Sequence, residues 1–282
     1  MPKRLMILAA GMSSRMKKET TQLIDSQLIN QANNLPKCMI GLGKGGRPFL
    51  DYLLLNAAAG GIEEVLLILN PKDNYTQNFY EKHQENGLVF GLKMLFARQH
   101  IPAGSQKPMG TSDAILQALA QFPAWKTGKF IVCNSDNIYP SKVFDLLYGS
   151  PQNTMIAFNS IGYSEERVRN CAIVHSNEAG FLVDLIEKPT DQEWQKIKAT
   201  MPKIAISWNI FGLNASEVIP FFENTPLHPI RNEKELPVSI RMLIQAQPSS
   251  MKAIWVDDVI PDLTAKADIA NVQEFLTLNF NE

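Results

Sequence analysis

The feature of this sequence that most constrains its fold is a series of short apolar segments, each bounded by Gly, Pro, Asn or Asp. Apolar runs of this length with such boundaries are typical of buried β-strands. We therefore predict strands at residues 5–10, 65–69, 92–97, 130–133, 154–158, 172–175, 181–186, 204–213 and 252–256.

The segments between these runs carry helical signals, such as Pro48 at a first helical position and Gly60 beyond the last turn. Strands and helices alternate in the first half of the chain, which favours a parallel sheet with helices on both faces. In the second half, closely spaced strands around Asn177 predict an antiparallel hairpin. The expected fold is an α/β, three-layer α/β/α sandwich with a mixed, mostly parallel sheet. The predicted helices span residues 48–59, 112–121, 141–147, 215–222, 235–245 and 264–278.

Two polar segments are expected to be long loops. Residues 17–36 are rich in Gln, Asn and Thr, and residues 99–109 contain Pro102, Gly104 and Pro108. Long connections inside a compact domain are uncommon and often functional, for example as lids.

Composition excludes several classes of protein. The chain has 282 residues and is 45% hydrophobic, and its 27 Lys+Arg against 28 Asp+Glu argue against disorder and against nucleic acid as the main partner. Three scattered cysteines form neither a disulfide framework nor a metal motif. No run approaches the roughly 18 apolar residues of a membrane span. We therefore expect a cytoplasmic protein without a membrane partner.

The loop after the first strand is the most informative segment. The strand ends in small residues at Leu8, Ala9 and Ala10, followed by Gly11 and a serine-rich turn that leads to Arg15. Small residues let backbone N–H groups approach phosphate oxygens, and an Arg can grip a phosphate with two hydrogen bonds. Ligands of open α/β sheets bind beyond the carboxyl ends of strands. Neither a GxGxxG nor a GxxxxGK[ST] motif is present.

These residues resemble the LAAGxGxR…PK signature of the sugar-phosphate nucleotidyltransferases, among them glucose-1-phosphate thymidylyl- and uridylyltransferases. Further segments are similar to family motifs and occur in the family's order. Each motif alone is weak, whereas the ordered set is a strong signal. The matching segments are Pro36-Lys37, Gln99 with Gly110–Ile115, Ser135-Asp136, Glu187-Lys188-Pro189, Asn209–Gly212 and Trp255-Val256-Asp257.

The resemblance implies a Rossmann-like fold of the nucleotide-diphospho-sugar transferase type and a single domain over residues 1–282. Residues 1–140 would be the nucleotide-binding part, residues 141–260 the sugar-binding part, and residues 264–278 a C-terminal helix. The implied partners are a nucleoside triphosphate and a sugar 1-phosphate, which react to give a nucleotide-sugar and pyrophosphate. Members often form dimers or tetramers, so a homo-oligomer is compatible with the resemblance.

The resemblance also implies the catalytic residues. Arg15 would hold the triphosphate and the departing pyrophosphate, Lys37 the α-phosphate, and Lys188 the phosphate of the sugar. No general base is required, because the attacking phosphate oxygen is already ionised. Asp136 and Asp257 would bind Mg²⁺, with Asp258 as the rival of Asp257. An Asp after a strand can alternatively cap a helix.

Base recognition would use Gln99, whose side chain offers the donor and acceptor that match N3–H and a carbonyl of uracil or thymine. The sequence therefore favours UTP or dTTP. Asn137, Glu187 and Asn209 would contact the sugar phosphate together with Lys188. Glu187 could instead only orient Lys188 or form a surface salt bridge. The nucleotide-binding residues implied are Leu8, Ala9, Ala10, Gly11, Ser13, Gln99, Gly110 and Thr111.

The chain departs from the family pattern in three places. Ser13 stands where many members have a second Gly. A Ser at this position is also common in the wider superfamily, for example in cytidylyltransferases. The 21 residues between Arg15 and Lys37 are about twice the family's usual spacing. Cys171-Ala172 replaces a Gly beside the sugar. Two alternatives therefore stay open: a CTP-dependent cytidylyltransferase acting on a phospho-alcohol such as phosphocholine, and a non-catalytic nucleotide-binding regulatory protein.

Overall fold

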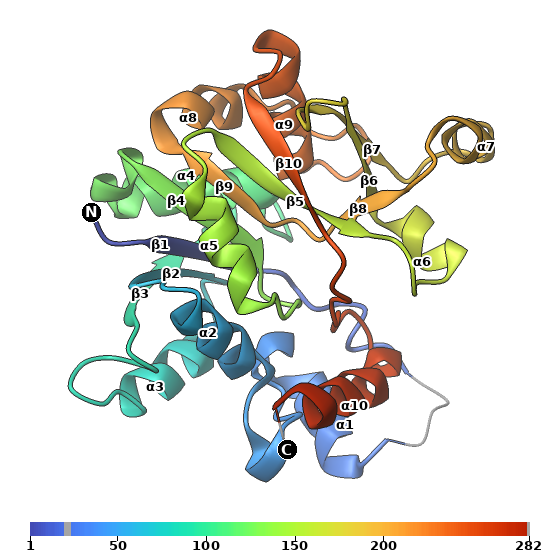
Figure 1. Cartoon of the computed structure of the whole chain (residues 1–282). Coiled ribbons are helices and arrows are strands. Elements are labelled where there is room, and N and C mark those ends of the chain that lie inside the picture. The colour runs from blue at the N-terminus through green and yellow to red at the C-terminus, as the bar shows by residue number, and fades with distance from the viewer. Residues whose placement is uncertain (20–23, 281–282) are drawn as a thin grey trace.

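The computed structural model of the chain describes residues 1–19 and 24–280. Its central element is one ten-stranded sheet (Figure 1). The strands are β1 (Arg4–Ala9), β2 (Glu64–Leu69), β3 (Lys93–Arg98), β4 (Lys129–Asn134), β5 (Asn153–Asn159), β6 (Ala172–Ser176), β7 (Leu182–Glu187), β8 (Ala205–Ser207), β9 (Phe211–Asn214) and β10 (Met251–Val256).

The strand order is β3-β2-β1-β4-β9-β5-β8-β6-β7, with β10 paired to β5. The pairs within β3-β2-β1-β4 are parallel, as is β10 with β5. The strands β9, β8 and β7 pair antiparallel to their neighbours. They therefore run against the other seven strands. The prediction of a mixed, mostly parallel sheet is confirmed.

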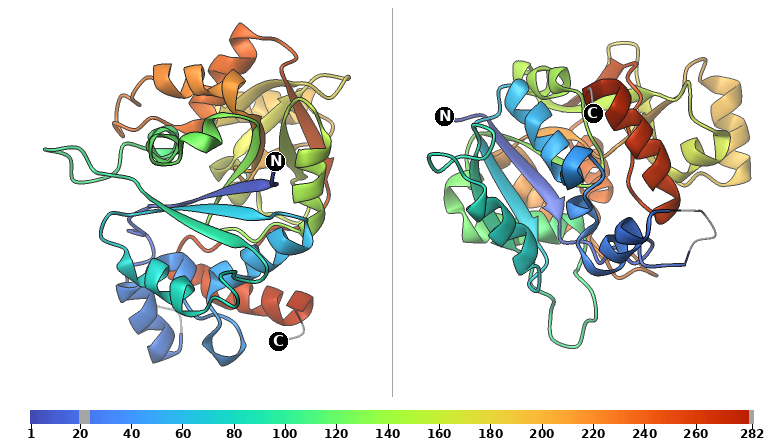
Figure 2. Two further views of the ribbon diagram at one scale, coloured as in Figure 1. Left: turned by 90° about the vertical axis from the view of Figure 1, so that its left-hand side faces the viewer. Right: turned by 90° about the horizontal axis from the view of Figure 1, so that it is seen from below.

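Helices cover both faces of the sheet (Figure 2). Side chains alternate along β1, so that Leu5 and Ile7 pack with α2, α3 and α5 while Met6 packs with α4, α8 and α9. The three-layer prediction is thereby confirmed. The helices are α1 (Ser26–Asn34), α2 (Phe49–Ala59), α3 (Asn74–Lys82), α4 (Thr111–Gln121), α5 (Ser141–Gly149), α6 (Glu165–Asn170), α7 (Asp191–Thr200), α8 (Ala215–Asn224), α9 (Leu236–Ala246) and α10 (Ile269–Phe280).

The predicted strand at residues 204–213 is wrong in one respect. It is two strands, because Asn209 adopts a left-handed conformation with φ of 53° between β8 and β9. The two halves lie on opposite sides of their shared neighbour β5, where β8 also pairs with β6 and β9 also pairs with β4. Periodicity could not reveal this break, because the flanking residues are apolar on both sides.

The prediction that residues 17–36 form a long loop is also wrong. Residues 20–23 lie outside the described part of the chain, and helix α1 occupies most of residues 24–36. Asp25 caps this helix by accepting hydrogen bonds from the backbone N–H groups of Gln27 and Leu28. Ala32 is fully buried in a hydrophobic cluster that also contains residues of α10, so tertiary packing stabilises a segment whose composition is typical of a loop.

Two short helices, α3 and α6, lie where no helix was predicted, and each begins at a capping side chain, Asp73 and Ser164. The C-terminal helix begins at Ile269 rather than at residue 264, because Asp268 accepts hydrogen bonds from the backbone of Thr264 and Ala265 and holds them in a turn. Among the described residues, no helix is long and apolar enough to cross a membrane.

Asp51 is a buried carboxyl group on α2, so its charge affects the stability of the fold. Its carboxylate accepts a hydrogen bond from the Tyr80 hydroxyl at 2.8 Å, and burial raises its pKa above the ordinary value. The folded state therefore holds this proton more tightly than the unfolded chain does. Protonated Asp51 contributes in full to the free energy of unfolding below the pKa that the group has in the unfolded chain. This contribution is lost as the pH rises through the raised pKa of the folded state.

We therefore expect Asp51→Asn, which keeps an acceptor for Tyr80, to raise the free energy of unfolding at neutral pH, because it removes the charge that burial disfavours. In mild acid the gain should disappear. Urea unfolding at neutral pH and in mild acid measures the free energy of unfolding of the variant and the wild type under each condition. The exposed Asp145 serves as the matched control, because Asp145→Asn should change stability little at either pH. An Asp51→Asn effect of the same size at both pH values would contradict this explanation.

Candidate active site

The loop after β1 opens a cavity at the carboxyl end of that strand. Ala10, Gly11, Ser13 and Arg15 line it, and Arg15 is exposed to it. Ser13 has φ of 51°, a left-handed conformation that glycine adopts without strain. The backbone therefore explains why a Gly is common at this position of the motif, and the Ser here bears the same turn.

Two connected cavities form the candidate site. The larger, about 600 Å³, and the smaller, about 240 Å³, share Arg15, Asn134, Asp136, Glu187 and Asn209. All predicted nucleotide-binding residues line the larger cavity, together with Lys37. The predicted sugar-phosphate residues Asn137, Glu187, Lys188 and Asn209 line the smaller one. The fold thus brings the predicted site residues together, with the exception of Asp257.

Asp136 lies just beyond the carboxyl end of β4, which pairs in parallel with β1. Its carboxylate forms an ion pair with the Lys37 ammonium, and both side chains are mostly buried. Lys37 begins the short helical turn η1 (Lys37–Met39), which contacts α2. Arg15, Lys37 and Asp136 therefore meet at one edge of the sheet, although they come from three separate segments.

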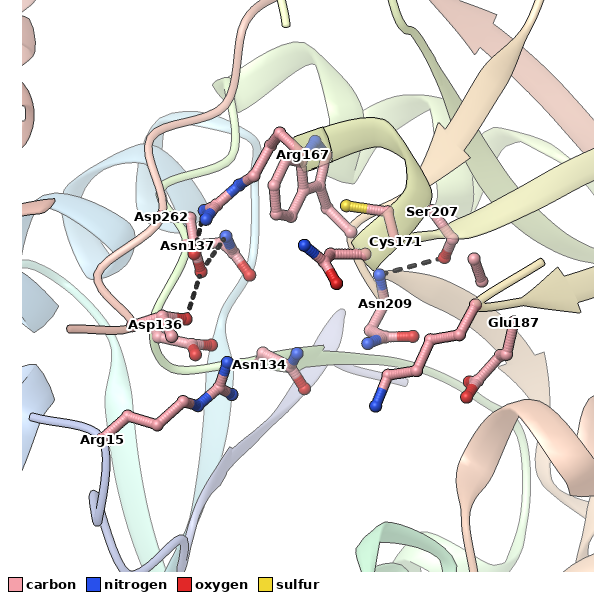
Figure 3. Close-up of a pocket in the computed structure, with 15 residues that line it drawn as sticks. Arg15, Asn134, Asp136, Asn137, Arg167, Cys171, Glu187, Ser207, Asn209 and Asp262 are labelled. Carbon is pink, nitrogen blue, oxygen red and sulfur yellow. Dashed lines mark hydrogen bonds and ion pairs between the residues drawn. The ribbon is translucent and has the colours of Figure 1, made fainter. Parts of the chain in front are cut away.

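A second carboxylate, Asp262, faces the same cavity as Asp136 (Figure 3). Arg167 pairs with Asp262, and Asn137 and Thr264 donate hydrogen bonds to it. Burial, reinforced by the nearby Asp136 carboxylate, raises the pKa of Asp262 to about 6. The two carboxylates are therefore close enough to repel each other, which is the electrostatic setting that favours a cation between them.

The predicted metal residue Asp257 is not brought to this place. It is exposed and accepts a hydrogen bond from Asn159 at 2.9 Å, and its neighbour Asp258 pairs with Lys142 at 2.6 Å. The chain continues for several residues before Asp262 returns to the site. The available sequence signal was an Asp two residues before the predicted helix at residues 264–278, but the tryptophan motif favoured the residues beside Trp255.

Gln99 is almost fully buried at the start of the predicted loop that follows β3. Its amide nitrogen donates to the Gly110 carbonyl at 2.8 Å and to the Asp113 carboxylate at 2.8 Å. Asp113 also accepts from Gln117 at 2.9 Å. Both partners of the Gln99 amide nitrogen are acceptors, so the orientation of the amide is fixed and only its oxygen remains to accept from a ligand.

Glu187 and Asn209 lie across the smaller cavity from Asp136 (Figure 3), and Lys188 also lines this cavity. Lys188 and Asn209 both have positive φ, 46° and 53°. Non-glycine residues in the left-handed backbone conformation are strained and often lie at functional sites. The amide oxygen of Asn209 is buried and accepts no hydrogen bond within the described chain, so it is available to a hydroxyl group. Desolvation, followed by the Glu235 carboxylate, raises the pKa of Glu187.

Sequence reasoning missed three cations that line the cavities, Lys107 and two arginines. Arg167 stacks on Trp208 with its guanidinium 5.3 Å from the ring centroid while it pairs with Asp262. Arg231 lines the larger cavity and pairs with Glu235 at 2.6 Å and with Glu187 at 3.9 Å. Both arginines belong to segments without a recognisable motif, so no local pattern distinguished them from surface arginines.

The fold and these cavities define an α/β protein with a site lined by cations and carboxylates at the carboxyl edge of a Rossmann-like sheet. A sequence model described as "Nucleotidyl transferase" matches residues 25–205, which include Lys37, Gln99, Asp136 and Lys188. The chain therefore belongs to the nucleotidyl transferase family. The resemblance found in the sequence motifs is confirmed.

Individual relatives are distant. A mannose-1-phosphate guanyltransferase of Candida albicans is 25% identical over 230 residues, which cover 79% of this chain and 55% of that protein. The chain thus spans about half the length of this curated relative. A UDP-glucose pyrophosphorylase solved with UDP-glucose is 17% identical, with a TM-score of 0.70 and coverage of 99% of both chains. A UTP-bound UGPase from Acinetobacter baumannii gives the same TM-score and identity, over 99% of this chain and 94% of that one. At this identity the structures establish the fold.

Gly110 should be essential to the geometry of the larger cavity. Its φ is 100°, and an added Cβ would lie 2.4 Å from the Lys234 carbonyl oxygen. That carbonyl accepts from Ser112, so it cannot move freely. We expect Gly110→Ala to lower the free energy of unfolding by about 1–3 kcal/mol and to displace the partner of Gln99. Thermal unfolding and nucleotide calorimetry measure the two effects.

Gly149 provides the control, because its φ is not positive and an added Cβ meets nothing within 4 Å. Gly149→Ala should leave both stability and nucleotide affinity near wild type. Wild-type behaviour of Gly110→Ala would refute the tight packing against Lys234.

Proposed function

We propose that this protein transfers a nucleotidyl group from a nucleoside triphosphate to a sugar 1-phosphate and releases pyrophosphate. The observation that carries the proposal is the convergence of Arg15, Lys37 and Lys188 with Asp136 on two connected cavities. Three cations from three segments match a reaction in which the phosphates of both substrates meet, because their negative charge must be offset for them to approach.

In the proposed reaction, a phosphate oxygen of the acceptor attacks the α-phosphorus. The new P–O bond forms as the bond to the β-phosphate oxygen breaks, and the bonding electrons leave with pyrophosphate. Lys188 would hold the attacking phosphate, Lys37 would offset charge on the α-phosphate, and Arg15 would hold the leaving group. No proton needs to move, so these roles call for permanent positive charge and correct position rather than for a base.

Lys37 is paired with Asp136 in the structure, so this pair must open before Lys37 can reach a phosphate. An incoming triphosphate supplies the alternative partner for the ammonium. The exchange leaves the Asp136 carboxylate without its cation, next to Asp262. The two carboxylates are then suited to bind a metal ion.

The residues present fit Mg²⁺. No cluster of three or more metal-ligating His, Cys, Asp or Glu side chains occurs in the described chain, so Asp136 and Asp262 would bind the ion together with phosphate oxygens and water. Mg²⁺ characteristically binds through one or two carboxylates and substrate phosphates. When bound, it would neutralise charge on the phosphates. Asp262 thus takes the role that the sequence assigned to Asp257.

UTP or dTTP remains the favoured nucleotide. The Gln99 oxygen would accept from N3–H of uracil or thymine, while a backbone N–H at the start of α4 would donate to a carbonyl of the base. GTP is the second candidate, because guanine presents N1–H beside O6 and the curated relative is named a guanyltransferase. The CTP-dependent and non-catalytic alternatives are separated from these by experiment.

A pyrophosphate-release assay tests the reaction. We expect turnover with UTP, dTTP or GTP and a hexose 1-phosphate, in the presence of Mg²⁺. Turnover with CTP and phosphocholine instead would favour the cytidylyltransferase. Nucleotide binding in calorimetry without any turnover would favour the regulatory protein.

Arg15 tests the triphosphate site. Arg15→Ala should lower turnover by about 10²–10³-fold, because it removes a charge that offsets the leaving pyrophosphate. The side chain is exposed, so thermal unfolding should stay unchanged. Arg241 on α9 is the control, because it pairs with Asp184 on β7 and lines neither cavity. If Arg15→Ala and Arg241→Ala show equal turnover, Arg15 does not hold the phosphates.

The metal residues are distinguished by their Asn variants. Asp262→Asn should raise the Mg²⁺ concentration needed for half-maximal turnover and weaken Mn²⁺ binding by about tenfold or more. Asp257→Asn should do neither, because Asp257 is exposed and bonded to Asn159. Turnover against Mg²⁺ concentration and Mn²⁺ electron paramagnetic resonance supply the measurements. If Asp257→Asn shows both effects and Asp262→Asn shows neither, Asp257 rather than Asp262 binds the metal ion.

A further inference from the structure

The segment between Arg15 and Lys37 and the C-terminal helix build a third hydrophobic core, which we call the accessory core. Helices α1 and α10 both contribute side chains to it, and it lies apart from the two cores on the faces of the sheet (Figures 1 and 2). No described residue of α1 or α10 lines either cavity. Its buried members are Met16, Ala32, Ile40, Leu42, Phe49, Tyr52, Ile138, Leu263, Ile269, Val272 and Leu276.

Three members of the accessory core lie one or two positions after residues of the site. Met16 follows Arg15, Ile138 comes shortly after Asp136, and Leu263 follows Asp262. Each of the three core side chains is at most 1% exposed. A shift of the accessory core would therefore move both carboxylates and residues 11–18, which we call the phosphate loop, although no buried member of this core lines either cavity.

Lys266 joins the parts of this core by polar contacts. Its side chain is buried, and its ammonium donates to the Lys18 carbonyl at 2.9 Å and to the Asn33 amide oxygen at 2.8 Å. Lys18 ends the phosphate loop and Asn33 lies on α1. A buried ammonium is costly unless its N–H groups are hydrogen-bonded, so these contacts fix the two segments relative to Lys266.

The segment between Lys266 and Asp262 is a tight turn. Asp268 accepts from the backbone N–H groups of Thr264 and Ala265 at 2.9 and 2.7 Å, and the Thr264 hydroxyl donates to Asp262 at 3.2 Å. The turn transmits a displacement of Lys266 to the Asp262 carboxylate, because its backbone is held at several points.

We propose that Lys266 is a positioning residue that couples the phosphate loop of Arg15 to the carboxylate of Asp262 through the accessory core. The coupling rests on the function proposed above, since it concerns a pyrophosphate held by Arg15 and a metal held by Asp262. Binding at the site thereby reduces the mobility of α1 and α10. Without Lys266, the phosphate loop and the Asp262 carboxylate would each still form but would be misaligned relative to each other.

Hydrogen exchange with Mg²⁺ and pyrophosphate tests the coupling, because this probe does not depend on the identity of the base. In the wild type, the probe should increase protection in residues 11–18 and also in α1 and α10. In Lys266→Met the added protection should stay within residues 11–18. Turnover should fall by about tenfold to a hundredfold with a smaller change in KM, because the reacting groups are bound but misaligned.

The conservative variant Lys266→Arg should recover protection of α10 and most of the turnover, since a guanidinium can donate to the same two oxygens. Should Lys266→Met fail to fold, Val272→Ala and Val218→Ala replace it. Both valines are 1% exposed on helices, Val272 in the accessory core and Val218 on α8. The two variants should lower Tm similarly, and only Val272→Ala should lower turnover and protection of α1.

The results separate failure of the coupling from failure of the proposed function. Calorimetry that detects no binding of Mg²⁺ and pyrophosphate to the wild type would overturn the proposed site and the coupling with it. Binding without added protection in α10, or equal turnover of Val272→Ala and Val218→Ala, would overturn the coupling alone.

Discussion

The parallel pairing of β1 with β4 is the constraint on which the rest of the site depends. It places Leu8 opposite Asn134, so the phosphate loop and Asp136 leave the sheet at the same edge. Parallel strands require crossover connections, and here the connections supply Lys37 and Gln99 to that edge as well. The positive and negative groups of the site are thus neighbours because of hydrogen bonds between two buried strands.

Three of the seven non-glycine residues with positive φ in the described chain line the cavities of the site. Ser13, Lys188 and Asn209 all have left-handed backbones without being glycine, and all three line the cavities. Each conformation costs of the order of 1 kcal/mol or more, which the surrounding sheet can offset. At Asn209 the turn also divides one apolar run into β8 and β9. The same strained residue therefore shapes both the sheet and the cavity.

Much of the fold and of the site follows from local patterns. Apolar runs and turn residues located the strands of the sheet, and the ordered motifs located Arg15, Lys37, Asp136 and Lys188, which the fold brings together. Local patterns failed at α1, because its stability comes from burial of Ala32 in the accessory core and from Lys266 rather than from its own composition. They also failed at Asp262, because proximity to Asp136 has no signature along the chain.

The sequence by itself determined the alternation of strands and helices and the chemical type of the site residues, because these depend on burial and on side-chain chemistry at each position. Only the tertiary structure decided which of several aspartates faces Asp136, which way the Gln99 amide points, and what the segment before Lys37 does. These properties arise from contacts between residues far apart in the chain, such as Lys266 with Asn33 and Asp262 with Arg167.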